Sequence, residues 1–144
     1  KKKKKGINKL LEKRLEQNAM KELKKKMTRS VMLVHGTAVE SIQRGSKSGK
    51  TYQLYNPRRT HTASREGEAP ATDTGFLVSQ IKVQKKSPDE VVVESTAPYS
   101  AFLEFGTSQM GERPFMHPAA MRAFPKIARA VFNKVVEKVK EFKV

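Results

Sequence analysis

Any chemistry in this chain would have to come from one glycine-rich segment, three histidines and scattered carboxylates. The segment at residues 45–51 reads Gly-Ser-Lys-Ser-Gly-Lys-Thr, which is similar to the phosphate-binding loop of nucleotide hydrolases. That loop needs one more residue between its first Gly and its Gly-Lys pair, and it follows an apolar strand. Here Arg44 stands where the first Gly should be, and a helical pattern precedes the segment. We therefore interpret it as a solvated basic loop.

The histidines do not form a site by spacing. His35 lies in a helical pattern, His61 in a polar stretch and His117 beside Pro118, and none has a carboxylate at ligand spacing. Neither a metal site nor a pair of base and nucleophile is indicated, and the acidic residues are too scattered to predict a two-carboxylate hydrolase. We expect no cofactor, no metal and no enzymatic activity, with a nuclease as a distant alternative.

Basic residues are the stronger signal. The chain has 144 residues with 30 Lys and Arg against 14 Asp and Glu, a net charge of +16. Such a charge favours contact with a polyanion, and clusters of this kind neutralise phosphates without reading bases. The residues predicted to lie near DNA are Lys1, Lys2, Lys3, Lys4, Lys5, Lys47, Lys50, Arg58 and Arg59. A solvated lysine-rich surface is the alternative, and it is equally compatible with residues 1–5 taken alone.

Composition limits the remaining classes. Apolar residues make up 37% and aromatics 7%, and there is no cysteine or Trp, so disulfides and thiol chemistry are excluded and the core must be modest. Mean hydropathy is -0.65, and no apolar run has the roughly 18 residues of a membrane span. The sequence predicts one soluble domain over residues 1–144 with no membrane partner. Its first residue is Lys rather than Met, so position 1 need not be the first codon of the gene.

The elements that carry these residues begin with a basic tail at 1–6 and a long helix at 7–43, which contains no proline. Its apolar residues form two stripes on nearly opposite faces. One stripe consists of Met20, Leu23, Met27, Val31, Val34, Ala38 and Ile42, and we expect it to pack on the chain's own sheet. The other consists of Ile7, Leu10, Leu11 and Leu15, and we expect it to contact a neighbouring subunit. The alternative is a kink near Asn18 that returns both stripes to one core.

The middle of the chain, residues 51–105, reads as a sheet. Residues 51–55 form one strand that ends at Asn56-Pro57, and residues 56–74 contain almost nothing to bury, which predicts a long functional or disordered loop. Residues 76–84 and 90–95 are predicted to pair as an antiparallel hairpin around the turn at 87–89. Residues 99–105 fit either a further strand or a short helix.

A final helix is predicted at 118–142, with Pro118 in its first turn and a kink or restart at Pro125. Its expected core stripe is Phe124, Ala128, Val131, Val135, Val139 and Phe142. The order of elements predicts an α+β fold in which the long N-terminal helix and the C-terminal helix pack on one face of a small antiparallel sheet of three to four strands.

Two stretches are more specific than the rest. The first runs from Ala-Pro at 69–70 through Thr74, Gly75 and Leu77 to Ile81. The second runs from Tyr99 through Glu-Phe-Gly-Thr at 104–107 and Arg-Pro-Phe at 113–115 to Pro-Ala at 118–119. In order and spacing they resemble the tailed-phage neck protein family typified by gene product ten of phage Hong Kong ninety-seven. The motif residues are Pro70, Thr74, Gly75, Leu77, Tyr99, Glu104, Phe105, Gly106, Thr107, Arg113, Pro114, Phe115 and Pro118.

Each of these motif residues also has a local structural interpretation. Gly75 and Gly106 permit backbone angles that other residues disfavour, and Pro70 and Pro114 fix extended entries into the segments that follow them. The two phenylalanines, at 105 and 115, are expected to anchor the core. Arg113 is expected either to pair with Glu104 or to lie solvated.

The resemblance implies a structural virion protein at the head–tail junction, made in the cytoplasm of the host bacterium. It implies a closed, hexameric ring around the DNA channel. The implied partners are the adjoining head-connector or stopper protein, the tail terminator or tail-tube protein, and packaged DNA in nonspecific contact. The alternative from another class is a sequence-nonspecific, chromatin-like DNA-binding protein, which the charge supports and the two motifs do not.

Overall fold

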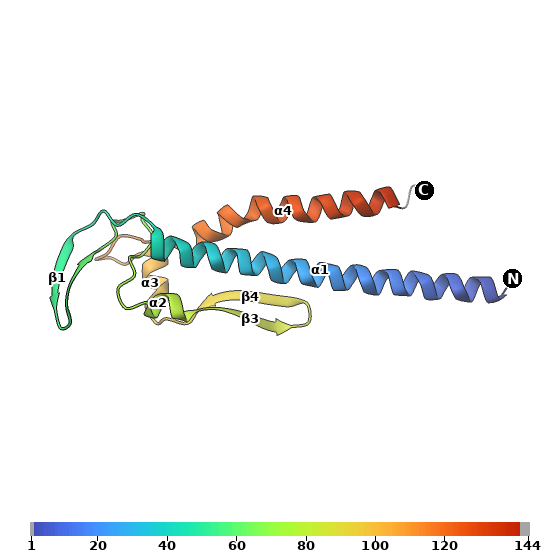
Figure 1. Cartoon of the computed structure of the whole chain (residues 1–144), viewed down its shortest axis with the longest axis horizontal. Helices are drawn as coiled ribbons and strands as arrows, with labels where there is room; N and C mark the ends of the chain where they lie inside the picture. Colours follow the sequence, from blue (N-terminus) through green and yellow to red (C-terminus); the bar gives the residue numbers. More distant parts are fainter. Residues whose placement is uncertain (1, 142–144) are drawn as a thin grey trace.

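The computed structural model describes residues 2–141, with side chains described for residues 9–130 and for positions 132, 133 and 137. The elements are α1 (Lys2–Arg44), β1 (Thr51–Tyr55), β2 (Arg58–Thr62), α2 (Phe76–Gln80), β3 (Ile81–Ser87), β4 (Glu90–Ser95), α3 (Ser100–Phe105) and α4 (Met116–Glu141). The long helices α1 and α4 run antiparallel beside each other, and the β3–β4 hairpin lies along α1 (Figure 1). The predicted α+β class with long N- and C-terminal helices is confirmed.

The four strands form two separate two-stranded antiparallel sheets rather than one sheet. The hairpin of β3 and β4 was predicted, whereas β2 lies in the stretch at 56–74 that was expected to be a loop. β2 pairs with β1 in a register that sets Thr51 opposite Thr62 and Tyr55 opposite Arg58. Both faces of this hairpin are mostly polar, so it has no apolar face with which to join the other sheet. It projects from one end of the molecule (Figure 1).

The predicted strand at 76–84 is wrong in its first half. Residues 76–80 form the short helix α2, which begins after Gly75 at a φ of 79°. Leu77 and Ile81 are four residues apart and both are buried in the core; this spacing puts two side chains on one face in a helix and in a strand alike, so the apolar pattern could not distinguish them. Of the two alternatives for residues 99–105, the helix is confirmed, as α3.

The core is a small cluster near the Arg44 end of α1. Its buried members are Ala38, Ile42, Leu77, Ile81, Ala97, Phe115 and Ala119. These side chains come from α1, α2, β3, the entry to α3 and the start of α4, so the elements converge here. The described β1–β2 hairpin contributes no member to this cluster.

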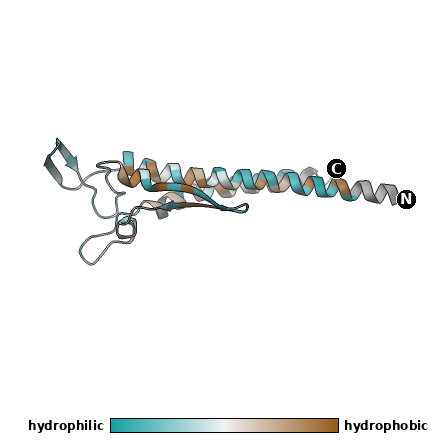
Figure 2. Cartoon of the chain, turned by 90° about the horizontal axis from the view of Figure 1, so that it is seen from below, coloured by the Kyte–Doolittle hydropathy of each residue, from teal (hydrophilic) through white to brown (hydrophobic). Residues whose placement is uncertain are grey.

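Toward its N-terminus α1 leaves the core as one unbroken helix, so the alternative of a kink near Asn18 is wrong. The stripe predicted to pack on the sheet does so from Val34 to Ile42, but Met27, Leu23 and Met20 are progressively more exposed, at 36%, 43% and 48%. The β3–β4 hairpin ends near this point, because Lys24 Nζ pairs with Asp89 Oδ1 at its turn, at 2.9 Å. Hydrophilic residues recur along α1 beyond it (Figure 2).

The predicted core stripe of the last helix is wrong over its described part. Phe124 is 65% exposed, whereas Ala119 and Ala123 are buried, so α4 presents small residues at a spacing of four to the rest of the molecule. Alanines let two helices approach closely, and a search for large apolar residues overlooks such a face. Helix α4 also continues through Pro125. Position 142 and the side chains at 131, 135 and 139 lie outside the described part of the chain.

We predict that Ile42→Ala, which truncates a side chain with 0% exposure, lowers the free energy of unfolding by about 2–4 kcal/mol because it leaves a cavity in the core. Met20→Ala on the same helix, half exposed, is the matched control and should cost under about 1 kcal/mol. Urea denaturation followed by circular dichroism measures both. Equal costs for the two substitutions would show that the core is not where the structure places it.

Candidate functional site

The second motif forms a cap on α4. The Glu104 carboxylate on α3 accepts three hydrogen bonds from the first backbone amides of that helix: Phe115 N at 2.9 Å and Met116 N at 3.0 Å to Oε2, and His117 N at 2.8 Å to Oε1. Such amides have no partner within their own helix, and the helix dipole favours a negative charge there. Glu104 therefore holds α4 against α3.

Arg113 does not pair with Glu104, and it is partly buried rather than simply solvated, so both expectations are corrected. Its Nε donates to the carbonyl of Ser64 at 3.3 Å and its Nη1 to that of Gly111 at 3.1 Å, while its backbone N donates to Leu103 O. Glu104 is occupied by the amides of α4, so the guanidinium turns to backbone carbonyls instead. Arg113 thereby links the segment after β2 to the exit of α3.

The two motif glycines both have a positive φ, 79° at Gly75 and 73° at Gly106. Gly75 starts α2, where Phe76 N donates to the hydroxyl of Thr74 at 3.4 Å. Gly106 ends α3, and a Cβ there would lie 2.9 Å from Met110 O. Thr107 then closes the next turn by accepting hydrogen bonds from Gln109 N and Met110 N. Positive φ and this close approach both restrict position 106 to glycine.

The other motif residues divide into buried and exposed ones. Phe115 is 1% exposed and is confirmed as a core anchor, whereas Phe105 is 80% exposed, so its prediction as a core residue is wrong. Leu77 and Pro70 are buried, and Pro114 and Pro118 are partly buried. Tyr99 is half exposed, and its ring centroid lies 6.2 Å from that of Phe76.

Glu68, a residue that the sequence patterns did not indicate, holds the glycine-rich segment to the loop after β2. Glu68 accepts hydrogen bonds from the hydroxyl and the backbone N of Ser48, at 2.5 and 3.1 Å, and from Arg65 N at 2.9 Å. These bonds, led by the one from the Ser48 hydroxyl, lower the pKa of Glu68. Gly49 N also donates to Ala63 O at 2.9 Å. A strand follows this segment where a nucleotide-binding loop requires a helix.

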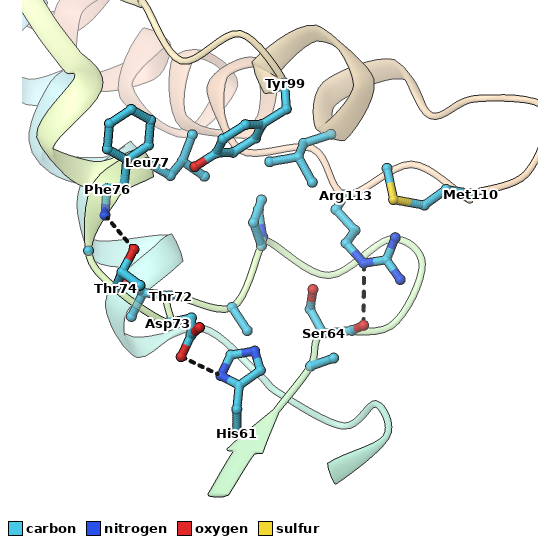
Figure 3. Close-up of a pocket in the computed structure, with 15 residues that line it drawn as sticks. His61, Ser64, Thr72, Asp73, Thr74, Phe76, Leu77, Tyr99, Met110 and Arg113 are labelled. Atoms are coloured by element: carbon cyan, nitrogen blue, oxygen red, sulfur yellow. Dashed lines mark hydrogen bonds and ion pairs between the residues drawn. The ribbon is translucent and has the colours of Figure 1, made fainter. Parts of the chain in front are cut away.

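An open cavity of about 290 Å³ lies between this loop, α2 and α3 (Figure 3). On its wall the Asp73 carboxylate pairs with Arg59, with Oδ1 2.9 Å from Nη1 and Oδ2 3.0 Å from Nη2. His61 Nδ1 lies 3.7 Å from Asp73 Oδ1. Ser64 also lines the cavity, and its carbonyl accepts the hydrogen bond from Arg113 (Figure 3). The carboxylate is engaged by Arg59 and serves to hold the β1–β2 hairpin to the segment before α2.

Among the described residues there is no group of three His, Asp or Glu able to hold a metal ion. Within the same part of the chain, no helix is both apolar and long enough to cross a membrane.

The residues predicted to lie near DNA are divided between two ends of the molecule. Lys47, Lys50 and Arg58 are exposed at the β1–β2 end, where Lys50 Nζ lies 5.7 Å from the centroid of the Tyr52 ring. Arg59 is neutralised by Asp73. Lys2, Lys3, Lys4 and Lys5 begin α1 at its other end, where a basic tail was predicted; their side chains, and Lys1, lie outside the described residues.

The residues predicted to contact a neighbouring subunit are exposed where the structure describes them. Leu10 is 71% exposed, and Leu11 and Leu15 are each 53% exposed; the side chain of Ile7 lies outside the described residues. We call Leu10, Leu11 and Leu15 the aliphatic face.

A second apolar surface was not predicted from the sequence, which indicated Phe105 as a core residue. Four aromatic side chains on α2, on α3 and at the residue that precedes α3 are 39–80% exposed; they are Phe76, Tyr99, Phe102 and Phe105. We call them the aromatic patch. The spacing of three between residues 99, 102 and 105 was the available signal, since it places these side chains near one another along a short helix.

Comparison with known proteins gives one family. Residues 5–106 match the family described as "Bacteriophage HK97-gp10, putative tail-component". No curated protein and no solved structure matches the chain. The matched residues include both exposed apolar surfaces, the aliphatic face and the aromatic patch.

We predict that Glu104→Ala lowers the free energy of unfolding by about 1–3 kcal/mol, because three amides at the start of α4 lose their acceptor. Glu90→Ala removes an exposed carboxylate from a hairpin turn and should change stability by under about 0.5 kcal/mol. Urea denaturation compares the two variants. A Glu104 variant as stable as wild type would show that the cap does not hold α4.

The low pKa of Glu68 makes a contribution to stability that depends on pH. A carboxylate whose pKa is lowered in the folded state stabilises the fold fully above its ordinary pKa, and this is lost as pH falls through the folded value. Glu68→Gln should therefore be less stable than wild type at neutral pH, and the difference should shrink in acid. Glu66→Gln, in the same loop, is the matched control. A difference in melting temperature that stays constant with pH would contradict this assignment.

Proposed function

Because the chain belongs to the HK97-gp10-like family of bacteriophage tail components, we propose that it is a structural subunit that forms a ring at the head–tail junction of a tailed phage. The family match carries this proposal. The ring would surround the DNA channel and adjoin a head-connector or stopper protein on one side and a tail terminator or tail-tube protein on the other. Its role is mechanical rather than enzymatic.

The exposed half of α1 supports assembly. Residues 10–23 of α1 present five large apolar side chains to solvent, each at least 43% exposed, on two faces of the helix. They are Leu10, Leu11, Leu15, Met20 and Leu23. Apolar side chains exposed in such number mark sites of contact with other molecules. A closed ring is the usual form of an assembly of identical subunits around one axis.

The charge distribution supports a position next to DNA. Residues 1–50 carry 16 of the 30 basic residues and 4 of the 14 acidic ones, so most of the net charge of +16 belongs to α1 and the loop after it. In a ring whose lumen is lined by such residues, the phosphate charges of packaged DNA are neutralised without sequence-specific contact. The same charge would suit a chromatin-like DNA-binding protein, which is the competing function.

We predict that the wild-type chain is a closed oligomer by native mass spectrometry, and that Leu11→Glu with Leu15→Glu gives a folded monomer. These side chains lie outside the core, so their replacement should leave the core around Ile42 folded, with a cooperative thermal unfolding transition in circular dichroism. Met32→Glu is the matched control, because Met32 is 54% exposed on the same helix about 25 Å from Leu15. Unfolding of the double variant would assign this face to the chain's own core.

Titration with duplex DNA at increasing salt separates the two functions. A wild-type chain that stays monomeric and binds duplex tightly, in a salt-sensitive way, would favour the chromatin-like protein. In the phage, removal of the gene should leave filled heads beside finished but unjoined tails in electron micrographs. Complete infectious particles would contradict the proposed role.

A further inference from the structure

Two apolar surfaces of the described chain, the aliphatic face and the aromatic patch, have no covering segment. The aliphatic face lies on the first turns of α1, and the aromatic patch lies on α2, on α3 and at the residue that precedes α3. Both belong to the part of the chain that matches the family.

The aromatic patch is large enough to form the centre of an interface. Each free ring exposes roughly 200 Å², so four rings that are 39–80% exposed present about 400 Å². That is about half of the 800 Å² that each partner buries in a typical stable interface. Exposed aromatic side chains of this kind supply most of the binding energy when they enter a partner's surface.

The aliphatic face has a shape that fits such a patch. Leu11 and Leu15 are one helical turn apart, and Leu10 lies beside them on the same side of α1. Arg14 is exposed and stands one turn after Leu10, so it projects from the same side. A guanidinium in this position can stack on an aromatic ring as the leucines pack against its neighbours.

The two surfaces cannot meet within one copy. The aromatic patch is held at the Arg44 end of α1, because Leu103 of α3 and Leu77 of α2 pack with Ile42 in one core. Residues 15 and 42 of a straight helix are about 40 Å apart. Helix α1 is unbroken over this span and its two ends lie far apart (Figure 1), so the partner must be another molecule.

Charge favours a second copy of this chain as that partner. From residue 87 to residue 112 the chain has no Lys or Arg. Of the carboxylates in this stretch, Asp89 pairs with Lys24, Glu94 with Lys86 and Glu104 with the amides of α4, so Glu112 is the one that lies beside the aromatic patch. Glu112 is exposed, and its backbone lies against Gly106, directly after Phe105. In contrast, residues 1–15 have eight basic residues and one Glu. In a chain of charge +16, identical copies repel each other except where such opposite surfaces meet.

We infer that the aliphatic face of one copy docks on the aromatic patch of the next copy, with Arg14 directed toward the rings and toward Glu112. This inference rests on the proposed ring and specifies how it closes. Because the two surfaces differ, the contact is head to tail, and repeating it around an axis generates a ring.

Two variants that each disable one surface test this contact. The first carries Leu11→Glu and Leu15→Glu, and the second carries Phe102→Ser and Phe105→Ser. Each alone should be a folded monomer by native mass spectrometry and circular dichroism. An equimolar mixture should form a one-to-one heterodimer and nothing larger, because it contains one intact aliphatic face and one intact aromatic patch per pair. Arg14→Glu should also give monomers, and Met121→Glu, at a 60% exposed residue of α4, should assemble like wild type.

Each other outcome overturns the inference in a recognisable way. If the aliphatic face pairs with itself, the second variant will dimerise alone. If either surface binds another virion protein instead, the corresponding variant will still form wild-type rings. If the wild-type chain is itself monomeric, the proposed function fails and the inference fails with it, whereas a wild-type ring with no heterodimer in the mixture removes the inference alone.

Discussion

Ile42 and Phe115 form the centre of a small buried cluster where the helices and the β3–β4 hairpin are joined. Both side chains are almost completely buried, and they join the end of α1 to the start of α4, with α2 and β3 packed around them. All other long-range order follows from this point. Because the cluster is small and lies at one end of a helix of 43 residues, most of α1 extends away from it. A helix of that length has to find its remaining stabilisation along α4, along a hairpin or on another molecule.

Polar contacts extend the order of this cluster into loops that have little to bury. Glu104 supplies the acceptor that the first amides of α4 need. Arg113 binds the segment after β2, and Glu68 joins that segment to the loop before β1. Glu104 thereby fixes α3 relative to α4, while Leu77 packs α2 into the same core. The aromatic patch is therefore a preorganised surface, and rigid aromatic anchors cost little entropy when a partner binds them.

The sequence predicted the elements that have a periodic pattern of residues. It did not predict the elements and surfaces that depend on contacts between distant residues. Helix α1, the β3–β4 hairpin and the capping glycines follow from helix propensity, alternation and turn chemistry. Strand β2 was missed because its Arg, Thr and His side chains show no alternation of apolar residues, and it is held by backbone pairing with β1. The inward face of α4 was missed because it consists of alanines. For Glu104 the family motif marked the right residue, but its partners are amides eleven to thirteen positions away, which only the fold brings together.

Leu10, Leu11 and Leu15 are exposed because α1 is one continuous helix and the core lies near its Arg44 end. If neighbouring copies, and not the chain's own core, hold the N-terminal half of α1, its amides should be protected from hydrogen exchange by assembly. Hydrogen exchange of the α1 amides, compared between the assembled chain and the monomeric Leu11→Glu, Leu15→Glu variant, measures this protection. We predict strong protection of residues 34–42 in both states, with protection of residues 9–23 only in the assembly. Equal protection of residues 9–23 in both states would contradict the account.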